Sequence, residues 1–258
     1  MTRAPTVRRD GSPLASAGRG LTGVEGGLTG VEGEPIEPAR QGAREPLVPR
    51  LRGMSHAIAF LLSVGCTALA VALAPTARTT VALAVYGGGL IALFGGSALY
   101  HRWPGSARFK LVLQRVDHSM IFVFIAATYT PIALVVLRGA VAWIVLVLAW
   151  VGAAAGVAFS LGWIGASRRI ITGSYLALGG IAVIAIPQLL HALGPAPLIL
   201  FAAGGVLYSA GAVVYLKRRP DPWPRTFGFH ELFHALVIAA AAAQYIAIIG
   251  WVLPAARS

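Results

Sequence analysis

Residues 79–101, TTVALAVYGGGLIALFGGSALYH, decide the fold class. No Asp, Glu, Lys or Arg interrupts this stretch, and as a helix it is long enough to cross about 30 Å of hydrocarbon. It also lacks the alternation of polar and apolar residues that marks a strand of a membrane barrel. A lipid-exposed backbone must satisfy its own hydrogen bonds, so we expect a membrane-spanning helix here.

Six further stretches share this composition. Of the 258 residues, 57% are apolar and only 12% are charged, whereas soluble domains are about half apolar and a quarter charged. This composition excludes a soluble enzyme and a disordered protein. The sequence predicts an all-α, integral-membrane bundle of seven helices within residues 50–258, and Pro131 and Pro187 predict kinks in the third and fifth of them. The predicted spans are 54–74, 79–101, 117–137, 140–162, 174–192, 197–216 and 228–253.

Residues 1–49 have a different composition, rich in Gly, Pro and Arg and without aromatic residues. The heptapeptide GLTGVEG occurs at 20–26 and again at 27–33, and two copies are too few for a repeat architecture. Such a segment cannot bury enough apolar surface to offset the entropy of ordering it. We therefore expect a disordered N-terminal tail.

The basic residues predict the orientation. The net charge is +12, from 21 Lys and Arg against 9 Asp and Glu. Eight basic residues precede the first span, ten more lie in loops on the same side, and only Arg78, Arg138 and Arg257 lie on the other. By the positive-inside rule the N-terminus is cytosolic and the C-terminus is outside. The surplus of basic residues then reflects the topology of the chain and attraction to anionic lipid head groups at the cytosolic face of the cell membrane. It gives no support for a nucleic-acid partner.

Ionisable side chains inside membrane spans are costly, so each one is a functional candidate. In this chain they gather at the predicted cytosolic ends of the spans, with a single histidine at the outer end. For three of them, His56, His118 and His191, we expect an ordinary interfacial position. The full set is His56, His101, Asp117, His118, His191, His230, Glu231 and His234.

Spacing along two of the helices points to a metal site. His230 and His234 are four residues apart and share one helix face, and His101 ends a neighbouring span. Three imidazoles can hold zinc and leave a fourth position for water, which zinc activates as a nucleophile. Asp117 can hold that water or act as its base, and Ser97, one turn before His101, can orient the water or a substrate carbonyl.

Other interpretations of these residues remain open. Asp117 can be the N-cap of the third span, and Ser97 can bond to a carbonyl of its own helix. Residues 230–234, HELFH, also match the zincin pattern, in which the glutamate is the base. Glu231 and Asp117 therefore compete for that role, unless Glu231 is solvated or paired with an arginine.

Four motifs together carry a family resemblance: SALYH at 97–101, RVDHS at 115–119, ATYTP at 127–131 and GFHELFH at 228–234. With PRLRG at 49–53 and His56, they resemble the hemolysin III family, the bacterial branch of the progestin and adipoQ receptors. The resemblance implies seven helices and zinc near the cytosolic face, held by His101, His230 and His234. Ser97 and Asp117 match the family's serine and aspartate, and the larger superfamily includes alkaline ceramidases.

The sequence thus favours a zinc-dependent, ceramidase-like hydrolase acting on an amide or ester of a membrane lipid whose acyl chain stays between helices. A cytolytic or pore-associated protein is an alternative, although polar residues do not run through the full thickness of the spans. A receptor or homeostasis regulator with structural zinc is another alternative. A metalloprotease ranks last, because the membrane edge of a bundle leaves little room for an extended peptide.

Overall fold

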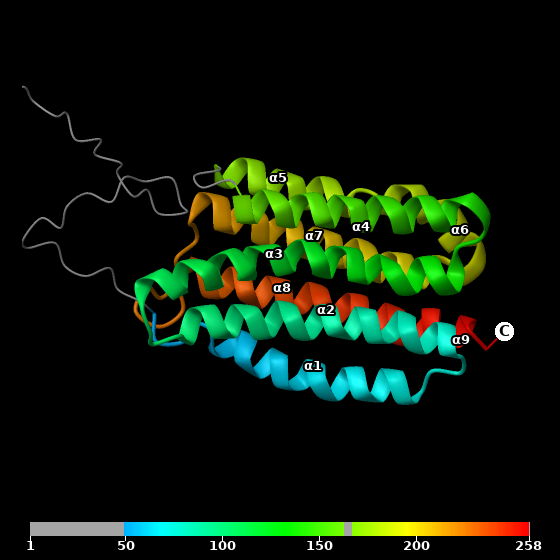
Figure 1. The fold of residues 1–258 in the computed structure, drawn as a ribbon, viewed down its shortest axis with the longest axis horizontal. Helices are drawn as coiled ribbons and strands as arrows, with labels where there is room; N and C mark the ends of the chain where they lie inside the picture. The colour runs from blue at the N-terminus through cyan, green and yellow to red at the C-terminus, as the bar shows by residue number, and fades with distance from the viewer. Residues whose placement is uncertain (1–48, 163–166, 258) are drawn as a thin grey trace, which may run out of the picture.

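The structure is a computed structural model that describes residues 49–162 and 167–257 (Figure 1). The predicted tail, residues 1–48, lies outside the described residues. Within the described ranges seven helical segments are long and apolar enough to cross a membrane, so the predicted all-α bundle is confirmed. The elements are α1 (Met54–Ala72), α2 (Ala77–Arg102), α3 (Ala107–Pro131), η1 (Ile132–Val136), α4 (Gly139–Gly162), α5 (Arg168–Gly179), α6 (Ala182–Leu193), α7 (Pro195–Lys217), α8 (Phe229–Ala247), η2 (Ile248–Val252) and α9 (Leu253–Ala255).

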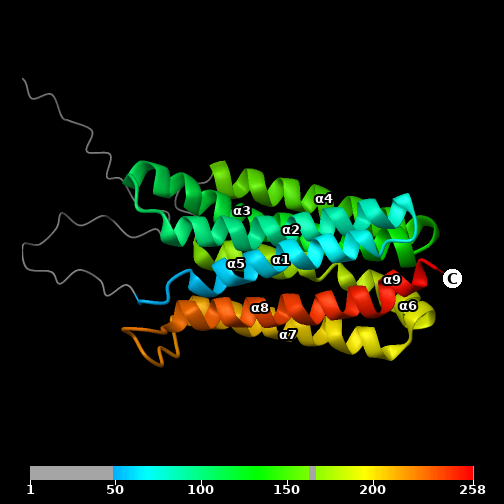
Figure 2. The ribbon, with the colours of Figure 1, turned by 90° about the horizontal axis from the view of Figure 1, so that it is seen from below.

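The spans run up and down the bundle, so loops alternate between its two ends. We call the end that carries the last turn of α2 and the first turn of α8 the histidine end, and the opposite one the far end. The C-terminal helix α9 lies at the far end (Figure 1). Seen from below, α1 lies between α2 and α8 (Figure 2), and it packs against both. The termini of three elements therefore meet at the histidine end.

The bundle is apolar on the inside and on the outside. Tyr86, Phe122 and Val145 are almost fully buried between helices. On the outer surface, Leu61 and Trp143 are each 68% exposed. Soluble proteins rarely expose a continuous apolar surface to water. An outer surface of this kind is suited to lipid.

Glycines let α2 approach its neighbours closely. A Cβ at Gly87 would lie 2.2 Å from Thr67 of α1, and one at Gly89 would lie 2.6 Å from Ala127 of α3. Both distances are impossible for real side chains, so α2 is held between α1 and α3 by contacts that only glycine permits.

The third span begins well before residue 117, and the interpretation of Asp117 as its N-cap is wrong. The N-cap of α3 is Ser106, whose hydroxyl accepts a hydrogen bond from the Phe109 backbone N–H at 3.4 Å. Arg108, Lys110 and Arg115 lower the hydropathy of the first turns, but all three are good helix formers and can reach the membrane surface. Asp117 therefore lies inside α3.

The two predicted kinks have different outcomes. At Pro131 the α-helix ends, and the chain continues as the π-helix η1, closed by a hydrogen bond from Leu137 N–H to the Ile132 carbonyl at 3.0 Å. The fifth span is interrupted between α5 and α6, at Gly180 and Ile181, whereas Pro187 lies within α6. Two adjacent glycines, not the proline, mark the interruption.

Tyr129 of α3 satisfies the backbone groups that this interruption leaves free. Its hydroxyl donates to the Gly179 carbonyl at 2.5 Å and accepts from the Ala182 N–H at 2.9 Å. An unpaired backbone group inside an apolar bundle is costly, so one phenol allows the fifth span to break.

Replacing Tyr129 by Phe should lower the free energy of unfolding by about 1–3 kcal/mol, because two backbone groups lose their partner. Tyr86→Phe is the matched control, since the buried Tyr86 hydroxyl has no hydrogen-bond partner among the described residues. Unfolding of the purified variants in detergent measures both effects. Equal loss of stability in the two variants would contradict this role for Tyr129.

Candidate metal centre

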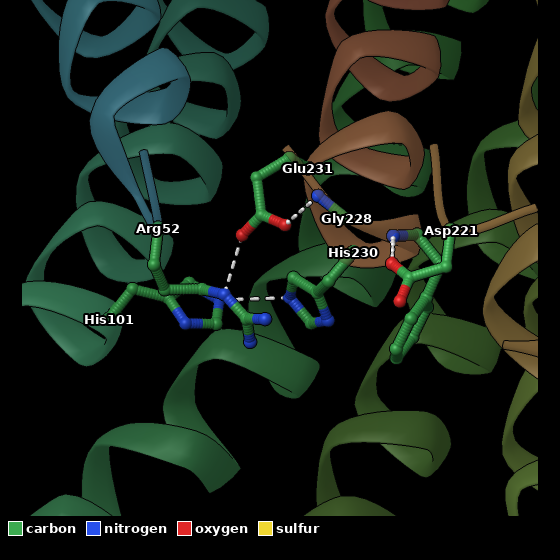
Figure 3. A network of polar contacts seen from close by, with 7 residues as sticks. Arg52, His101, Asp221, Gly228, His230 and Glu231 are labelled. Carbon is green, nitrogen blue, oxygen red and sulfur yellow. Dashed lines mark hydrogen bonds and ion pairs between the residues drawn. The ribbon is translucent and has the colours of Figure 1, made fainter. Parts of the chain in front are cut away.

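Three histidines converge at the histidine end. His101 lies in the last turn of α2, while His230 and His234 lie in the first turns of α8. One ring nitrogen from each lies within 4.8 Å of the others, and the Nε2 atoms of His101 and His230 are 3.1 Å apart (Figure 3). The three predicted ligands are thus brought together, and a metal ion could be held between them.

The chemistry of this cluster suits a metal ion such as zinc. His234 is 2% exposed, and its Nδ1 has no hydrogen-bond partner among the described residues. Two Nε2 atoms at 3.1 Å either share one proton or present two lone pairs to a common cation. Neutral imidazole nitrogens from a buried site are typical zinc ligands, so the residues present fit the expected metal.

His56 belongs to the same cluster, and its expected interfacial position is wrong. Its side chain is 3% exposed, and its ring stacks on that of His234 with centroids 3.8 Å apart and planes 12° apart. Phe94 makes an edge contact with the His56 ring, with the two ring centroids 5.2 Å apart. The expectation for His56 rests only on its place near the end of a span, which carries no information about this packing. Its occurrence with PRLRG in a family motif was the available signal.

The other histidines lie outside the cluster. His118 is half-buried within α3, and its backbone carbonyl accepts a hydrogen bond from the Tyr175 hydroxyl at 3.0 Å. His191 is exposed in α6, at the far end.

Glu231 is paired with an arginine, as one of the open interpretations had it. Its side chain is 2% exposed; Oε1 lies 2.6 Å from Nε of Arg52, and Oε2 accepts from the Gly228 N–H at 2.9 Å (Figure 3). Both carboxylate oxygens are therefore engaged in fixing the start of α8. Removing Arg52 would leave a buried charge without its partner, a situation that costs several kcal/mol in other proteins.

The segment before α1 closes over the cluster. Arg50 and Leu51 donate backbone hydrogen bonds to the carbonyls of Arg225 and Thr226, in the loop before α8, at 3.2 and 3.4 Å. Gly53 follows with a φ of +73°, and a Cβ there would lie 2.7 Å from Cβ of His101. Both the left-handed conformation and the close approach require glycine at this position. Sequence reasoning assigned no role to Arg52 or Gly53, and the PRLRG motif was again the available signal.

Ser97 and Asp117 form a second group. Ser97 is buried on α2, one turn from His101, and its side chain is a hydrogen-bond partner of the Asp117 carboxyl group on α3. Asp117 is not among the three side chains whose ligand atoms cluster. The five predicted site residues therefore form two groups, the three histidines and the pair of Ser97 and Asp117. Helix α2 connects the groups, because it carries both His101 and Ser97.

The stack on His234 leads to a prediction. His56→Ala should weaken metal binding by roughly tenfold or more, because the ring of His234 loses the surface that holds its plane. His56→Phe should keep most of the affinity, since an aromatic ring remains.

Competition for Zn²⁺ against a fluorescent chelator, with full-length protein in detergent, measures both constants. If His56→Phe loses as much affinity as His56→Ala, stacking is not the role of His56.

Comparison with known proteins gives a consistent relationship. Residues 46–245 match the pattern of the family described as haemolysin-III related. The chain is 31% identical to Hemolysin-3 of Bacillus cereus over 206 residues, which cover 79% of this chain and 91% of that protein. It is 29% identical to the Hemolysin-3 homolog of Bacillus subtilis (strain 168), over 76% of this chain and 90% of that one.

A more distant similarity joins the chain to a plant protein. Over 91 residues it is 34% identical to the heptahelical transmembrane protein ADIPOR2 of Oryza sativa subsp. japonica, covering 31% of this chain and 40% of that protein. No solved structure matches the chain.

Proposed function

Because this chain belongs to the haemolysin-III-related family, a family of multi-pass membrane proteins, we propose that it is a zinc-dependent hydrolase of lipid amide or ester bonds. The observation that carries the proposal is the convergence of three histidine nitrogens within 4.8 Å at one end of the bundle, where His234 is buried and His101 and His230 are half-buried. Ordinary interfacial histidines would point toward water instead of toward one another.

His101, His230 and His234 would hold the zinc ion. Zinc in such a site supplies Lewis acidity toward a carbonyl oxygen and toward water. The protein's part is to hold the three rings in place, and the stack of His56 on His234 and the ion pair of Arg52 with Glu231 support that role.

Asp117 is the proposed base. A carboxylate that accepts a proton from water needs one oxygen free of strong partners, and Glu231 has neither oxygen free. The partner of Asp117 among the described residues is the neutral side chain of Ser97, which can orient the carboxylate without removing its basicity. Ser97 would thus position Asp117.

The location of the cluster favours a lipid substrate. It lies at one end of the bundle, near exposed apolar side chains that could contact an acyl chain, among them Leu51 at 42% and Met54 at 40% exposed. The loops and helix ends on this side of the bundle carry most of the basic residues of the described chain, so by the positive-inside rule this end is the cytosolic one in our proposal. A substrate with its polar bond at the membrane surface and its chain in the bilayer would reach the cluster.

A cytolytic function is the second candidate, and the names of the Bacillus relatives favour it. A water-filled path would need polar side chains along the whole bundle. Among the described residues the buried ionisable side chains gather toward the histidine end, and the rest of the buried polar set consists mostly of Ser and Thr. The arrangement therefore supports a local site better than a pore.

The test uses full-length protein in nanodiscs, its zinc content, and a panel of fluorescent ceramides, N-acyl amides and acyl esters. His230→Ala should lose both zinc and turnover. Asp117→Asn should keep zinc and lose at least about 100-fold in turnover, because only the proton acceptor is removed. His191→Ala, at the far end, is the matched control and should change neither.

Wild-type protein that carries stoichiometric zinc and cleaves no member of the panel would contradict the hydrolase proposal. Release of liposome contents that persists in His230→Ala would favour the cytolytic alternative instead.

A further inference from the structure

A cavity of about 530 Å³ lies at the far end of the bundle, away from His101, His230 and His234. Its apolar walls include Val135 and Val136 of η1 together with Pro187 and Ala192 of α6. Cavities that hold small organic ligands have volumes of about 300–1,000 Å³ and are mostly apolar with a few polar groups. The volume and apolar lining of this cavity suit the hydrophobic part of a lipid.

Three polar side chains also line this cavity, Arg138, Gln188 and His191. Arg138 is exposed and follows η1, and its guanidinium has no ion pair with any described residue. The three acidic side chains of the described chain are Asp117, Asp221 and Glu231, and none lines the cavity. Arg138 therefore has no carboxylate side chain of the described protein as a counter-ion there.

The backbone of Arg138 is fixed by α6. The side-chain amide of Gln188 accepts from the Arg138 N–H at 2.9 Å and donates to the Arg138 carbonyl at 3.4 Å. These two bonds engage the amide of Gln188 with the main chain, and they tie the turn after η1 to the opposite wall of the cavity. The backbone of Arg138 is consequently held in place beside the cavity.

The local backbone is also unusual. Ile132–Val136 form a π-helix, a rare conformation that occurs frequently at functional sites. It follows Pro131 directly and presents Val135 and Val136 to the cavity. Within a membrane, an irregular backbone is tolerated only where protein contacts or a cavity surround it.

We propose that this far-end cavity binds a lipid with an anionic phosphate head group. The phosphate pairs with the Arg138 guanidinium, which can donate two parallel hydrogen bonds to it, and His191 supplies a further polar contact. Apolar chain adjacent to the head group occupies the space between η1 and α6. This site is separate from the histidine cluster and does not depend on the proposed hydrolysis.

The experiment measures lipid retention by native mass spectrometry on delipidated full-length protein. The probes are phosphatidylglycerol, phosphatidylcholine of the same chain length, and glycerol phosphate without chains. Phosphatidylglycerol should bind in preference to the other two. Arg138→Gln should weaken that binding about tenfold, the loss expected for a charge-assisted contact.

Two further variants make the test specific. Ala192→Phe should weaken phosphatidylglycerol binding by filling the cavity while leaving Arg138 in place. Arg78→Gln is the matched control, because Arg78 is an exposed arginine at the same end that does not line the cavity, and it should leave binding unchanged.

Three outcomes would overturn the proposal. Equal losses in Arg138→Gln and Arg78→Gln would show only general attraction of the far end for anions. Binding of glycerol phosphate as tight as that of the lipid would remove the role of the apolar walls. Equal binding of phosphatidylcholine and phosphatidylglycerol would remove the role of the unpaired guanidinium.

Discussion

The high cost of burying a polar group without a partner is the constraint on which the fold and the candidate site of this bundle depend. Inside a helical membrane bundle no bulk water is available, and an unsatisfied donor or acceptor costs several kcal/mol. The Tyr129 hydroxyl accordingly bridges the interruption of the fifth span. Glu231 is held by Arg52 and by the backbone of Gly228, and Asp117 has Ser97 as its partner.

In the histidine cluster this constraint is not met by protein groups alone. His101 and His230 bring two ring nitrogens together, and Nδ1 of the buried His234 has no partner among the described residues. A cation could satisfy all three rings at once, which is why we propose a metal centre here. At the far end, the exposed guanidinium of Arg138 lies at a cavity that no carboxylate side chain of the described residues lines.

Much of the fold could be predicted because long runs without charge leave few alternatives to a membrane helix. The ends of the spans were harder to predict, since the basic residues before Asp117 resemble a loop in composition although they are helix formers. The sequence predicts a kink at Pro187 in the fifth span, but the α-helix is interrupted at Gly180 and Ile181, where Tyr129 offers a hydrogen-bond partner. A hydrogen bond from another helix leaves no trace in local sequence.

The candidate ligands could be predicted from spacing, because residues four apart share a helix face. Arg52 and His56 could not, since their roles come from packing between the start of α1 and the start of α8. Arg52 and its partner Glu231, for example, lie 179 residues apart in the sequence. A pairing over that distance depends on the folded bundle and is not encoded in the pattern of either helix.

X-ray absorption at the zinc edge, on full-length protein purified without chelators, tests the metal centre most directly. We expect about one zinc per chain with three imidazole nitrogens and one oxygen donor in the first coordination sphere. Protein that remains folded and contains no stoichiometric metal, or a coordination sphere without histidine nitrogens, would contradict it.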